Sequence, residues 1–319
     1  MEELPLVSVI IPCYNGEKVM DRLLDSLLYQ TYNQLEVILV NDGSDDKSEE
    51  IWRLYEKKFK EKNIKTKYIY HENQGLGATI NAGLQVVTGK YFCWPDVDDY
   101  LELQSIEKRV EFLEAHTDFG SVSSDAYCYN EDDLVHPVNR VAEWMIHKND
   151  VWQFRHMLEG QSIYCAGCHM VRTSCFKTTN PKMQIYPARR GQNNQMLLPI
   201  YYKYKHGYID EPLYNYILYN KSMSSTDETY ERALDRAEEY SKIIAYTLDM
   251  IEMDEDSVRY CLNQKRKIDW DNFSKVYIDF GKPVHFIRIY IKLKIYKTSQ
   301  KREIKGLLYS VLRYKKIRR

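Results

Sequence analysis

The first hundred residues alternate between short apolar runs and segments with helical periodicity. Apart from Ser8 and Glu36, residues 7–11 and 35–40 have apolar and mostly β-branched side chains, which predict buried strands. Further strands are expected at 67–70 and 91–94. Between the first two strands, apolar residues recur on one helix face: Met20, Leu23, Leu24, Leu27 and Leu28. Helices are also expected after Ser44, which can cap one, and at 76–87.

This order of strand, helix, strand, helix predicts the fold class. Crossovers of this length join parallel strands and cover both faces of the sheet, so an α/β, doubly wound, mostly parallel sheet is expected. Ligands of such sheets bind beyond the carboxyl ends of the strands. Function is therefore expected at residues 12–16, 41–44 and 95–99.

The second half of the chain is less regular and rich in Tyr, Trp and Met. A helix is expected at about 102–116, a strand near 120–129, and helical segments near 150–158, 191–205 and 225–253. Residues 286–297 fit both a strand and a helix, and 303–317 form an amphipathic helical pattern. The expected domains are residues 1–222, divided into halves at 1–122 and 123–222, and a helical region at 223–319.

Charge is distributed unevenly along the chain. Residues 282–319 hold 13 Lys or Arg and one acid, Glu303, so this tail carries +12 and the rest of the chain carries -13. Basic and apolar residues together suit the surface of an anionic bilayer, and residues 283–319 are the expected contact; a helix face packed on the protein is the alternative. The acidic remainder and the absence of a nucleic-acid-binding motif argue against nucleic acid as a partner.

The sequence shows neither an export signal nor about 18 consecutive apolar residues, so we expect a cytoplasmic protein at the inner face of the cell membrane. Seven cysteines without a secretory signal predict reduced thiols. Cys165, Cys168, His169 and Cys175 also allow a zinc site, but a second spaced ligand pair is absent, and buried apolar cysteines are the simpler interpretation.

Three polar clusters follow the expected strands and carry the chemistry. Pro12, Cys13, Tyr14 and Asn15 form a turn in which Tyr14 can frame a base, and Asp42 follows the second strand. The third cluster is the acidic run 96–99, whose carboxylates at i and i+2 suit a hard cation, Mg²⁺ or Mn²⁺. Each cluster alone is typical of an ordinary turn. A functional site is indicated because the three clusters lie together at the ends of successive strands.

With these residues the sequence resembles the family 2 glycosyltransferases of GT-A fold, among them bacterial cell-surface polysaccharide enzymes. The resemblance runs from about residue 6 to 122. It rests on five segments, namely Val7-Ser8-Val9-Ile10-Ile11-Pro12-Cys13-Tyr14-Asn15-Gly16, Gln30-Thr31-Tyr32, Glu36 to Ser44, Asn73-Gln74-Gly75 and Asp96-Val97-Asp98-Asp99. Two later segments, 191–195 and 208–213, resemble the bacterial subgroup.

The resemblance implies roles for individual residues. The Pro12 to Tyr14 turn and Asp42 would hold the nucleotide base, Asp96 would lie at the ribose, and Asp98 would hold a metal bridging the diphosphate. The implied donor-binding set is Pro12, Cys13, Tyr14, Asn15, Asp42, Asn73, Gly75, Asn81, Asp96 and Val97. The implied catalytic positions are Asp98, Asp99, Asn193 and His169, and the implied metal ligands are Asp98 and Asp96.

Two positions depart from the family pattern. Family members often have Ala-Arg-Asn where this chain has Thr79-Ile80-Asn81, which removes a basic phosphate contact. The Glu-Asp pair that supplies the catalytic base is replaced by Gln192-Asn193, and an amide does not take a proton at neutral pH. Three explanations stay open: an anionic acceptor such as a lipid phosphate, a different base (Glu159, Asp210 or His169), or binding without turnover.

The resemblance therefore implies a metal-dependent, inverting glycosyltransferase of cell-surface polysaccharide synthesis. Its donor would be a nucleotide-diphosphate sugar, with a UDP-sugar favoured, and its acceptor would be lipid-linked or a glycan. The alternative is a module that binds a nucleotide sugar without turnover, because the usual base position is Asn193.

Overall fold

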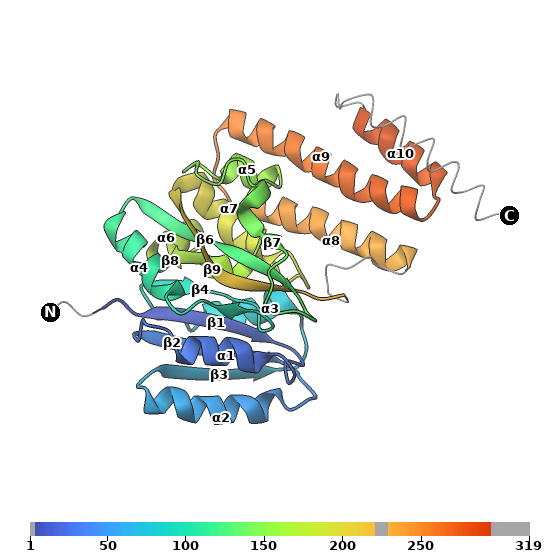
Figure 1. Cartoon of the computed structure of the whole chain (residues 1–319). Coiled ribbons are helices and arrows are strands. Elements are labelled where there is room, and N and C mark those ends of the chain that lie inside the picture. Colours follow the sequence, from blue (N-terminus) through green and yellow to red (C-terminus); the bar gives the residue numbers. More distant parts are fainter. Residues whose placement is uncertain (1–3, 221–228, 295–319) are drawn as a thin grey trace. The chain divides into compact units, whose positions relative to one another are not determined.

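The computed structural model describes residues 4–220 and 229–294, and side chains up to residue 291. The chain divides into two compact units, residues 1–223 and 224–319, and each is described by itself. Figure 1 shows the elements of both.

The first unit is built on one mixed sheet. Within the described residues its strands run in the order β3-β2-β1-β4-β8-β6-β9-β5, and β7 pairs with β6. Strands β1 to β4 are parallel to one another, whereas β8 is antiparallel to both β4 and β6. The strands are β1 Val7–Cys13, β2 Leu35–Asp42, β3 Lys65–His71, β4 Tyr91–Cys93, β5 Tyr100–Leu101, β6 Phe119–Asn130, β7 Asn139–Arg140, β8 His169–Arg172 and β9 Lys205–Leu218.

Helices cover both faces of this sheet. The α-helices of the first unit are α1 Met20–Leu28, α2 Ser48–Glu61, α3 Leu76–Leu84, α4 Ser105–Ala115, α5 Phe154–Leu158, α6 Thr173–Thr179 and α7 Gln192–Lys203, with 3-10 turns at Val141–Trp144 and Ala166–Cys168. Together with the sheet they form an α/β fold whose first four strands are parallel, so the expected α/β class and the expected elements of the first hundred residues are confirmed.

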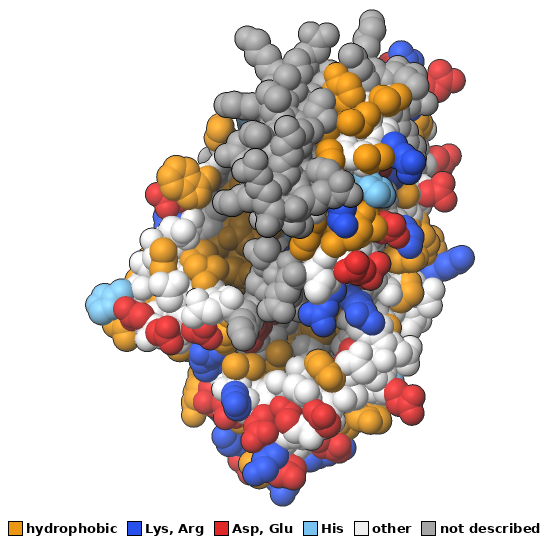
Figure 2. All heavy atoms as spheres, turned by 90° about the vertical axis from the view of Figure 1, so that its right-hand side faces the viewer, with side chains coloured by type: hydrophobic (Ala, Val, Ile, Leu, Met, Phe, Trp, Pro, Cys, Tyr) orange, Lys and Arg blue, Asp and Glu red, His pale blue; other side chains and the backbone are white. Residues whose placement is uncertain are grey.

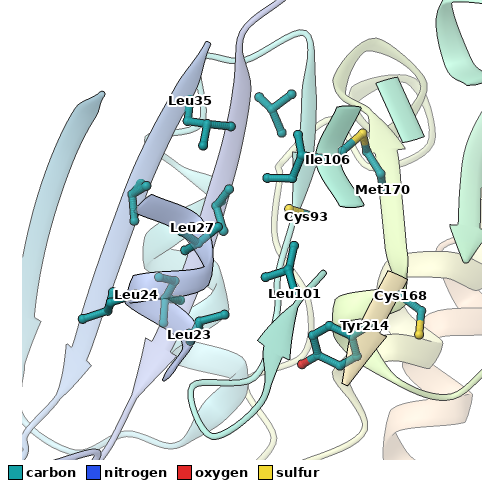
Figure 3. Packing of buried hydrophobic residues seen from close by; sticks show 14 of the residues in the cluster. Leu23, Leu24, Leu27, Leu35, Cys93, Leu101, Ile106, Cys168, Met170 and Tyr214 are labelled. Atoms are coloured by element: carbon teal, nitrogen blue, oxygen red, sulfur yellow. The ribbon is translucent and has the colours of Figure 1, made fainter. Parts of the chain in front are cut away.

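Alternation along β1 explains why two faces are covered. Val9 and Ile11 belong to the same buried cluster as Leu23 and Leu27 of α1, shown in Figure 3. Ile10 points to the opposite face, where it packs so closely on α3 that a Cβ at Gly83 would lie 2.4 Å from Ile10 Cγ2. A strand that is buried on both faces has a nearly continuous apolar sequence, as residues 7–11 do apart from Ser8.

The second half of the first unit completes the sheet. Strand β9 runs parallel to β6 along most of its length, and β5, which directly follows the acidic run 96–99, pairs with β9 in an antiparallel manner. Because β5 is attached to β9, residues near 214–217 lie against the acidic run. The sequence pattern does not predict β9, which is interrupted by Pro212 and by register shifts.

The second unit consists of helices in its described part. They are α8 Tyr230–Asp249, α9 Glu255–Asp279 and α10 Pro283–Lys294. Thr229 and Asp254 cap α8 and α9 by accepting from backbone amides of Arg232 and Ser257. Phe286 of α10 packs edge-on against Trp270 of α9, so the described part of 286–297 is helical. Residues 303–317 lie outside the described residues.

Surface charges are mixed on the face drawn in Figure 2, where Lys and Arg side chains lie among Asp and Glu side chains. The excess of basic residues falls at 282–319, most of which lies outside the described residues. None of the described helices is both long enough and apolar enough to cross a membrane.

Candidate active site

The turns that follow β1, β2 and β4 lie together, as expected for neighbouring parallel strands. The backbone N–H of Asn15 donates to Ser44 Oγ (2.9 Å), and the N–H of Asp45 donates to Asn15 Oδ1 (3.0 Å). Gly16 lies beside Val97, since a Cβ at position 16 would be 3.5 Å from Val97 Cγ2. The three predicted clusters therefore form one site at one edge of the sheet.

The turn after β1 presents an aromatic ring to solvent. Tyr14 is 54% exposed, whereas Cys13 beside it is buried, and burial raises the pKa of its thiol. Asn15 adopts a positive φ of 52°, which small polar side chains tolerate. The turn thus offers a fixed backbone and one accessible aromatic face.

Asp42 is buried at the end of β2 and organises the turn that follows β3. Its Oδ1 accepts from the N–H of Gln74 (2.8 Å), and its Oδ2 accepts from the N–H of Gly75 (3.0 Å). His71 Nδ1 lies 3.2 Å from the same carboxylate. The turn after β2 also approaches the turn after β3 closely. This approach requires a glycine at position 43 (φ +73°), because a Cβ there would lie 2.7 Å from the backbone nitrogen of Asn73. Asp42 therefore connects two of the predicted donor-binding segments.

Segment 185–189 packs along α3, which begins at the 73–75 turn. Asn81 donates to the carbonyl of Ile185 (2.9 Å) and accepts from its N–H (2.7 Å). The N–H of Gly77 donates to the carbonyl of Ala188 (2.8 Å). Arg189 consequently lies over Gly75, where a Cβ would be 3.3 Å from Arg189 Cγ. Asn81 thus contacts this segment with both the oxygen and the nitrogen of its side-chain amide.

The acidic run 96–99 follows β4 and is held by β9. Asp99 is buried and accepts from the Tyr214 hydroxyl (2.7 Å) and from the N–H of Ile217 (2.8 Å). The same hydroxyl accepts from the N–H of Asp96 (3.3 Å). Figure 3 shows Tyr214 at the end of the buried cluster. Asp96 and Asp98 remain partly exposed, so they are the accessible carboxylates.

The electrostatics of this run suit a cation. Burial raises the pKa of Asp96 to about 7, and the charge of Asp98 adds to the effect. Burial likewise raises the pKa of Asp98, against which the charge of Arg22 acts. Burial and the other two carboxylates raise the pKa of Asp99. A divalent cation would remove this repulsion, and oxygen ligands at i and i+2 fit Mg²⁺ or Mn²⁺.

Such a cation would take only part of its ligands from the protein. Among the described residues, no group of three or more His, Cys, Asp or Glu side chains is arranged to enclose a metal. A site with two accessible carboxylates leaves coordination positions open for phosphate oxygens, which is how Mg²⁺ is commonly bound. Cys165, Cys168, His169 and Cys175, the residues of the possible zinc site, are all buried side chains and are not grouped as metal ligands in the described part of the chain.

Arg22 of α1 is a site residue that the pattern of apolar positions does not reveal. Its Nη2 donates to the carbonyl of Asp98 (3.0 Å) and to the Tyr219 hydroxyl (2.6 Å). It lies two residues after the start of α1, where the sequence gives only an amphipathic helix. Its position in the sequence could have indicated this role, because Arg22 lies near the amino end of α1, which comes soon after the 12–16 turn.

Asn193, at the position of the expected base, makes two hydrogen bonds. Its Oδ1 accepts from Trp94 Nε1 (2.8 Å), and its Nδ2 donates to the carbonyl of Tyr164 (2.7 Å). Trp94 directly precedes Pro95 and the acidic run, so the start of α7 lies close to the carboxylates. An amide side chain fits this position because its oxygen accepts the bond from Trp94 and its nitrogen donates the bond to Tyr164.

The other candidate bases lie in different surroundings. His169 is fully buried, its Nε2 lies 3.1 Å from the Ile163 carbonyl, and burial lowers its pKa to about 3, so the ring is neutral. Asp210 forms ion pairs with Arg140 (2.7 Å) and Lys148 (3.6 Å). Glu159 is exposed after the last turn of α5.

Comparison with known families identifies the chain. The sequence model of "Glycosyl transferase family 2" matches residues 8–179, which is more than half of the chain. The match covers β1 to β8 and the acidic run, and it ends before α7 and β9.

Curated relatives carry the same general description. An uncharacterized glycosyltransferase of Rickettsia prowazekii is 43% identical over 109 residues, which are 34% of this chain and 32% of the relative. The uncharacterized glycosyltransferase EpsJ of Bacillus subtilis is 32% identical over 183 residues, 56% of this chain and 51% of EpsJ. The chain thus matches about a third to a half of the length of these relatives.

Solved structures share the fold. Residues 1–349 of TarS from S. aureus, in complex with UDP-GlcNAc, match with a TM-score of 0.66 at 18% identity, over 98% of this chain and 92% of that chain. The mannosyltransferase PcManGT of Pyrobaculum calidifontis, in complex with GDP-Man and Mn²⁺, matches with a TM-score of 0.57 at 13% identity, over 97% of this chain and 85% of that one. At these identities the likeness concerns the fold.

Proposed function

The chain belongs to glycosyl transferase family 2, and from this premise we propose that it transfers a sugar from a nucleotide-diphosphate sugar to a lipid-linked or glycan acceptor. The observation that carries the proposal is the pair of accessible carboxylates, Asp96 and Asp98, which directly follows β4 beside the 12–16 turn. A UDP-sugar donor and a role in cell-surface polysaccharide synthesis are part of the proposal.

On the donor side we assign the nucleotide to the 12–16 turn. Tyr14 and the backbone of Pro12 to Asn15 contact the base, while Asp42 supports this region by fixing the turn at Asn73 to Gly75. Asp96 lies at the ribose, with Val97 beside it. Asn81 acts indirectly, because its amide holds segment 185–189 against α3.

The diphosphate is proposed to bind at Asp98 through Mg²⁺ or Mn²⁺. The metal, when bound, would neutralise the charge that develops on the leaving diphosphate. Asp98 would be its main ligand and Asp96 a second one, while Asp99 keeps the loop in place through Tyr214 and Ile217. Arg22 supports the same loop from α1.

The proposed reaction is a single displacement with inversion. Asn193 positions the groups around the reaction centre and takes no proton, and the neutral, buried His169 is not assigned as the base. A general base typically contributes about 10²- to 10⁴-fold to a rate, so slow transfer to a hydroxyl remains compatible with the site. An ionised acceptor such as a lipid phosphate would not need a base.

We also propose peripheral binding to an anionic membrane through residues 283–319. On α10 the apolar side chains Val284, Ile287 and Ile291 are exposed, while Phe286 on the other side is buried. Residues 295–319 add nine Lys or Arg and one acid. Each basic residue near an anionic surface contributes about 1 kcal/mol.

Calorimetric titration with UDP and GDP, each with and without Mn²⁺, tests the donor site first. We expect metal-dependent binding of UDP, and loss of the metal dependence in Asp98→Ala. Hydrolysis of a panel of UDP-sugars should show the same dependence. Full activity in Asp98→Ala would refute the metal role, and no nucleotide binding under any condition would refute the function.

A binding module without turnover is the second candidate, and the amide at position 193 favours it. This candidate predicts tight nucleotide binding without hydrolysis or transfer. Assays with farnesyl phosphate and with methyl pyranosides as acceptors separate the two candidates, because any metal-dependent product formation excludes the second.

A further inference from the structure

Tyr164 presents an exposed aromatic ring beside the candidate reaction centre. Its side chain is 49% exposed, although both of its neighbours in the sequence, Ile163 and Cys165, are buried. Its carbonyl accepts the hydrogen bond from Asn193 Nδ2 (2.7 Å). The backbone of Tyr164 is therefore fixed to the position where family members carry the catalytic base.

The ring is also held through a contact with another aromatic side chain. The ring packs edge-to-face on Tyr216, with the centroids 6.0 Å apart and the planes at 85°. Half of the side chain stays exposed despite these contacts, so the exposed surface belongs to a ring that is already ordered.

Strand β9 connects this ring to the carboxylates. Side chains two residues apart on a strand point to the same face, so Tyr214 and Tyr216 lie on one side of β9. Tyr214 donates to Asp99 (2.7 Å), and Tyr216 packs against Tyr164. Tyr214, Tyr216 and Tyr164 are together called the aromatic wall: Tyr214 contacts the acidic loop, and Tyr216 packs on the exposed Tyr164.

We propose that Tyr164, supported by Tyr216, is the binding platform for a pyranose ring of the acceptor. This inference rests on the proposed function, because it takes the acidic loop as the donor side. Asn193 lies between Trp94, next to that loop, and Tyr164, so the exposed ring lies on the side from which the acceptor approaches.

The chemistry of the wall favours a sugar. An aromatic face carries partial negative charge and attracts the C–H groups on the apolar face of a pyranose, in the way that aromatic rings attract ring edges. Because the Tyr164 backbone is hydrogen-bonded and its ring packs on Tyr216, this side chain loses little conformational entropy when a ligand binds, which favours the binding of weak ligands. The platform would therefore recognise a sugar ring by shape, without a charged contact.

Saturation-transfer NMR with methyl pyranosides tests the platform directly. The probes are methyl α-D-glucopyranoside, methyl β-D-galactopyranoside and methyl N-acetyl-β-D-glucosaminide, each with and without UDP and Mg²⁺. We expect saturation transfer to the ring C–H protons of at least one probe. In Tyr164→Ala its affinity should fall by about fivefold to tenfold, as expected for the loss of one aromatic contact.

Two variants make the result specific. Tyr164→Phe keeps the ring and loses the hydroxyl, so it should retain binding within about twofold, which separates ring stacking from a hydroxyl contact. Tyr29→Ala removes an exposed tyrosine at the end of α1 and should leave the signals unchanged. UDP affinity should be the same in all four proteins.

The outcomes separate this inference from the proposed function. Pyranoside signals that persist unchanged in Tyr164→Ala, or that are absent while UDP still binds, overturn the platform. Absence of UDP binding in the unaltered protein, with pyranoside signals that depend on Tyr164, overturns the donor assignment and leaves the sugar platform standing.

Discussion

The indole Nε1 of Trp94 donates a 2.8 Å hydrogen bond to Oδ1 of Asn193, 99 residues later in the sequence. This bond connects the end of β4 to the first turn of α7. The second amide atom of Asn193 connects the same turn to Tyr164. One side chain thus links the strand that leads into the acidic loop with the segment proposed to bind the acceptor.

The first prediction concerns Asn193→Asp. A carboxylate can still accept from Trp94, but it cannot donate to the Tyr164 carbonyl, and its charge would face that oxygen. We expect the free energy of unfolding to fall by about 1–3 kcal/mol. Urea denaturation at pH 7 measures it. Asn194→Asp, one residue later, serves as the control and should change stability less; equal losses would contradict the special role of position 193.

The second prediction concerns Arg22→Met. Its guanidinium holds the Asp98 carbonyl and the Tyr219 hydroxyl, and its charge lies next to the acidic loop. Without it the loop is less ordered, and we expect the affinity for UDP with Mn²⁺ to fall by about tenfold. Calorimetry provides the measurement. Arg53→Met on α2, whose guanidinium pairs with Glu49 and Glu56, is the matched control and should bind UDP normally.

The third prediction concerns Glu36, which is buried between β1 and β3. Burial raises the pKa of Glu36, but hydrogen bonds from Lys67, Ser8 and Thr88 outweigh burial and lower the pKa overall. The carboxylate therefore contributes stability that is complete above its unfolded pKa and is lost as pH falls through the lowered folded pKa. Unfolding free energies between pH 7 and pH 3 should show this loss.

Glu36→Gln isolates that contribution. The variant should be less stable at pH 7 by about 2 kcal/mol, because an amide cannot accept from all of these donors. Its stability should also depend less on pH in the acid range than that of the unaltered protein. Parallel pH profiles for the two proteins would show that another group causes the acid dependence.

The fourth prediction concerns binding to membranes. Replacing Val284, Ile287 and Ile291 together by Ser removes the exposed apolar side of α10 and leaves the buried Phe286 in place. Sedimentation with phosphatidylglycerol-rich vesicles at low salt should decrease, and deletion of 295–319 should decrease it further. Replacing the exposed Val258 and Leu262 of α9 by Ser is the control, for which sedimentation should stay unchanged.

Sequence patterns predict the first half of the fold because both faces of β1 and β2 are buried. Apart from Ser8 and Glu36, residues 7–11 and 35–40 are apolar, and α1 has a single apolar side. The pattern does not predict α9, because its apolar residues lie all around the helix. Val258 and Leu262 are exposed, whereas Trp270 and Val276 are buried.

The candidate site is predictable in part for a similar reason. Asp42 and the run 96–99 follow strands that the pattern identifies, so their proximity follows from the order of parallel strands. The partners of Asp99 do not follow from it, since Tyr214 lies 115 residues later and reaches Asp99 only through the pairing of β5 with β9. The pairing of strands this far apart in the sequence is a tertiary contact, and the periodicity of apolar residues carries no information about it.

The late position of β9 has a consequence for how the protein acquires its site during synthesis. The segments that precede β9 already contain the acidic loop, but Asp99 obtains its two hydrogen bonds only when residues 214–217 join the sheet. A chain emerging from the ribosome would hold its carboxylates unsupported until that strand arrives. Strands that are distant in the sequence pair slowly. The binding site should therefore be among the last parts of this unit to form, at the moment when β9 joins the sheet.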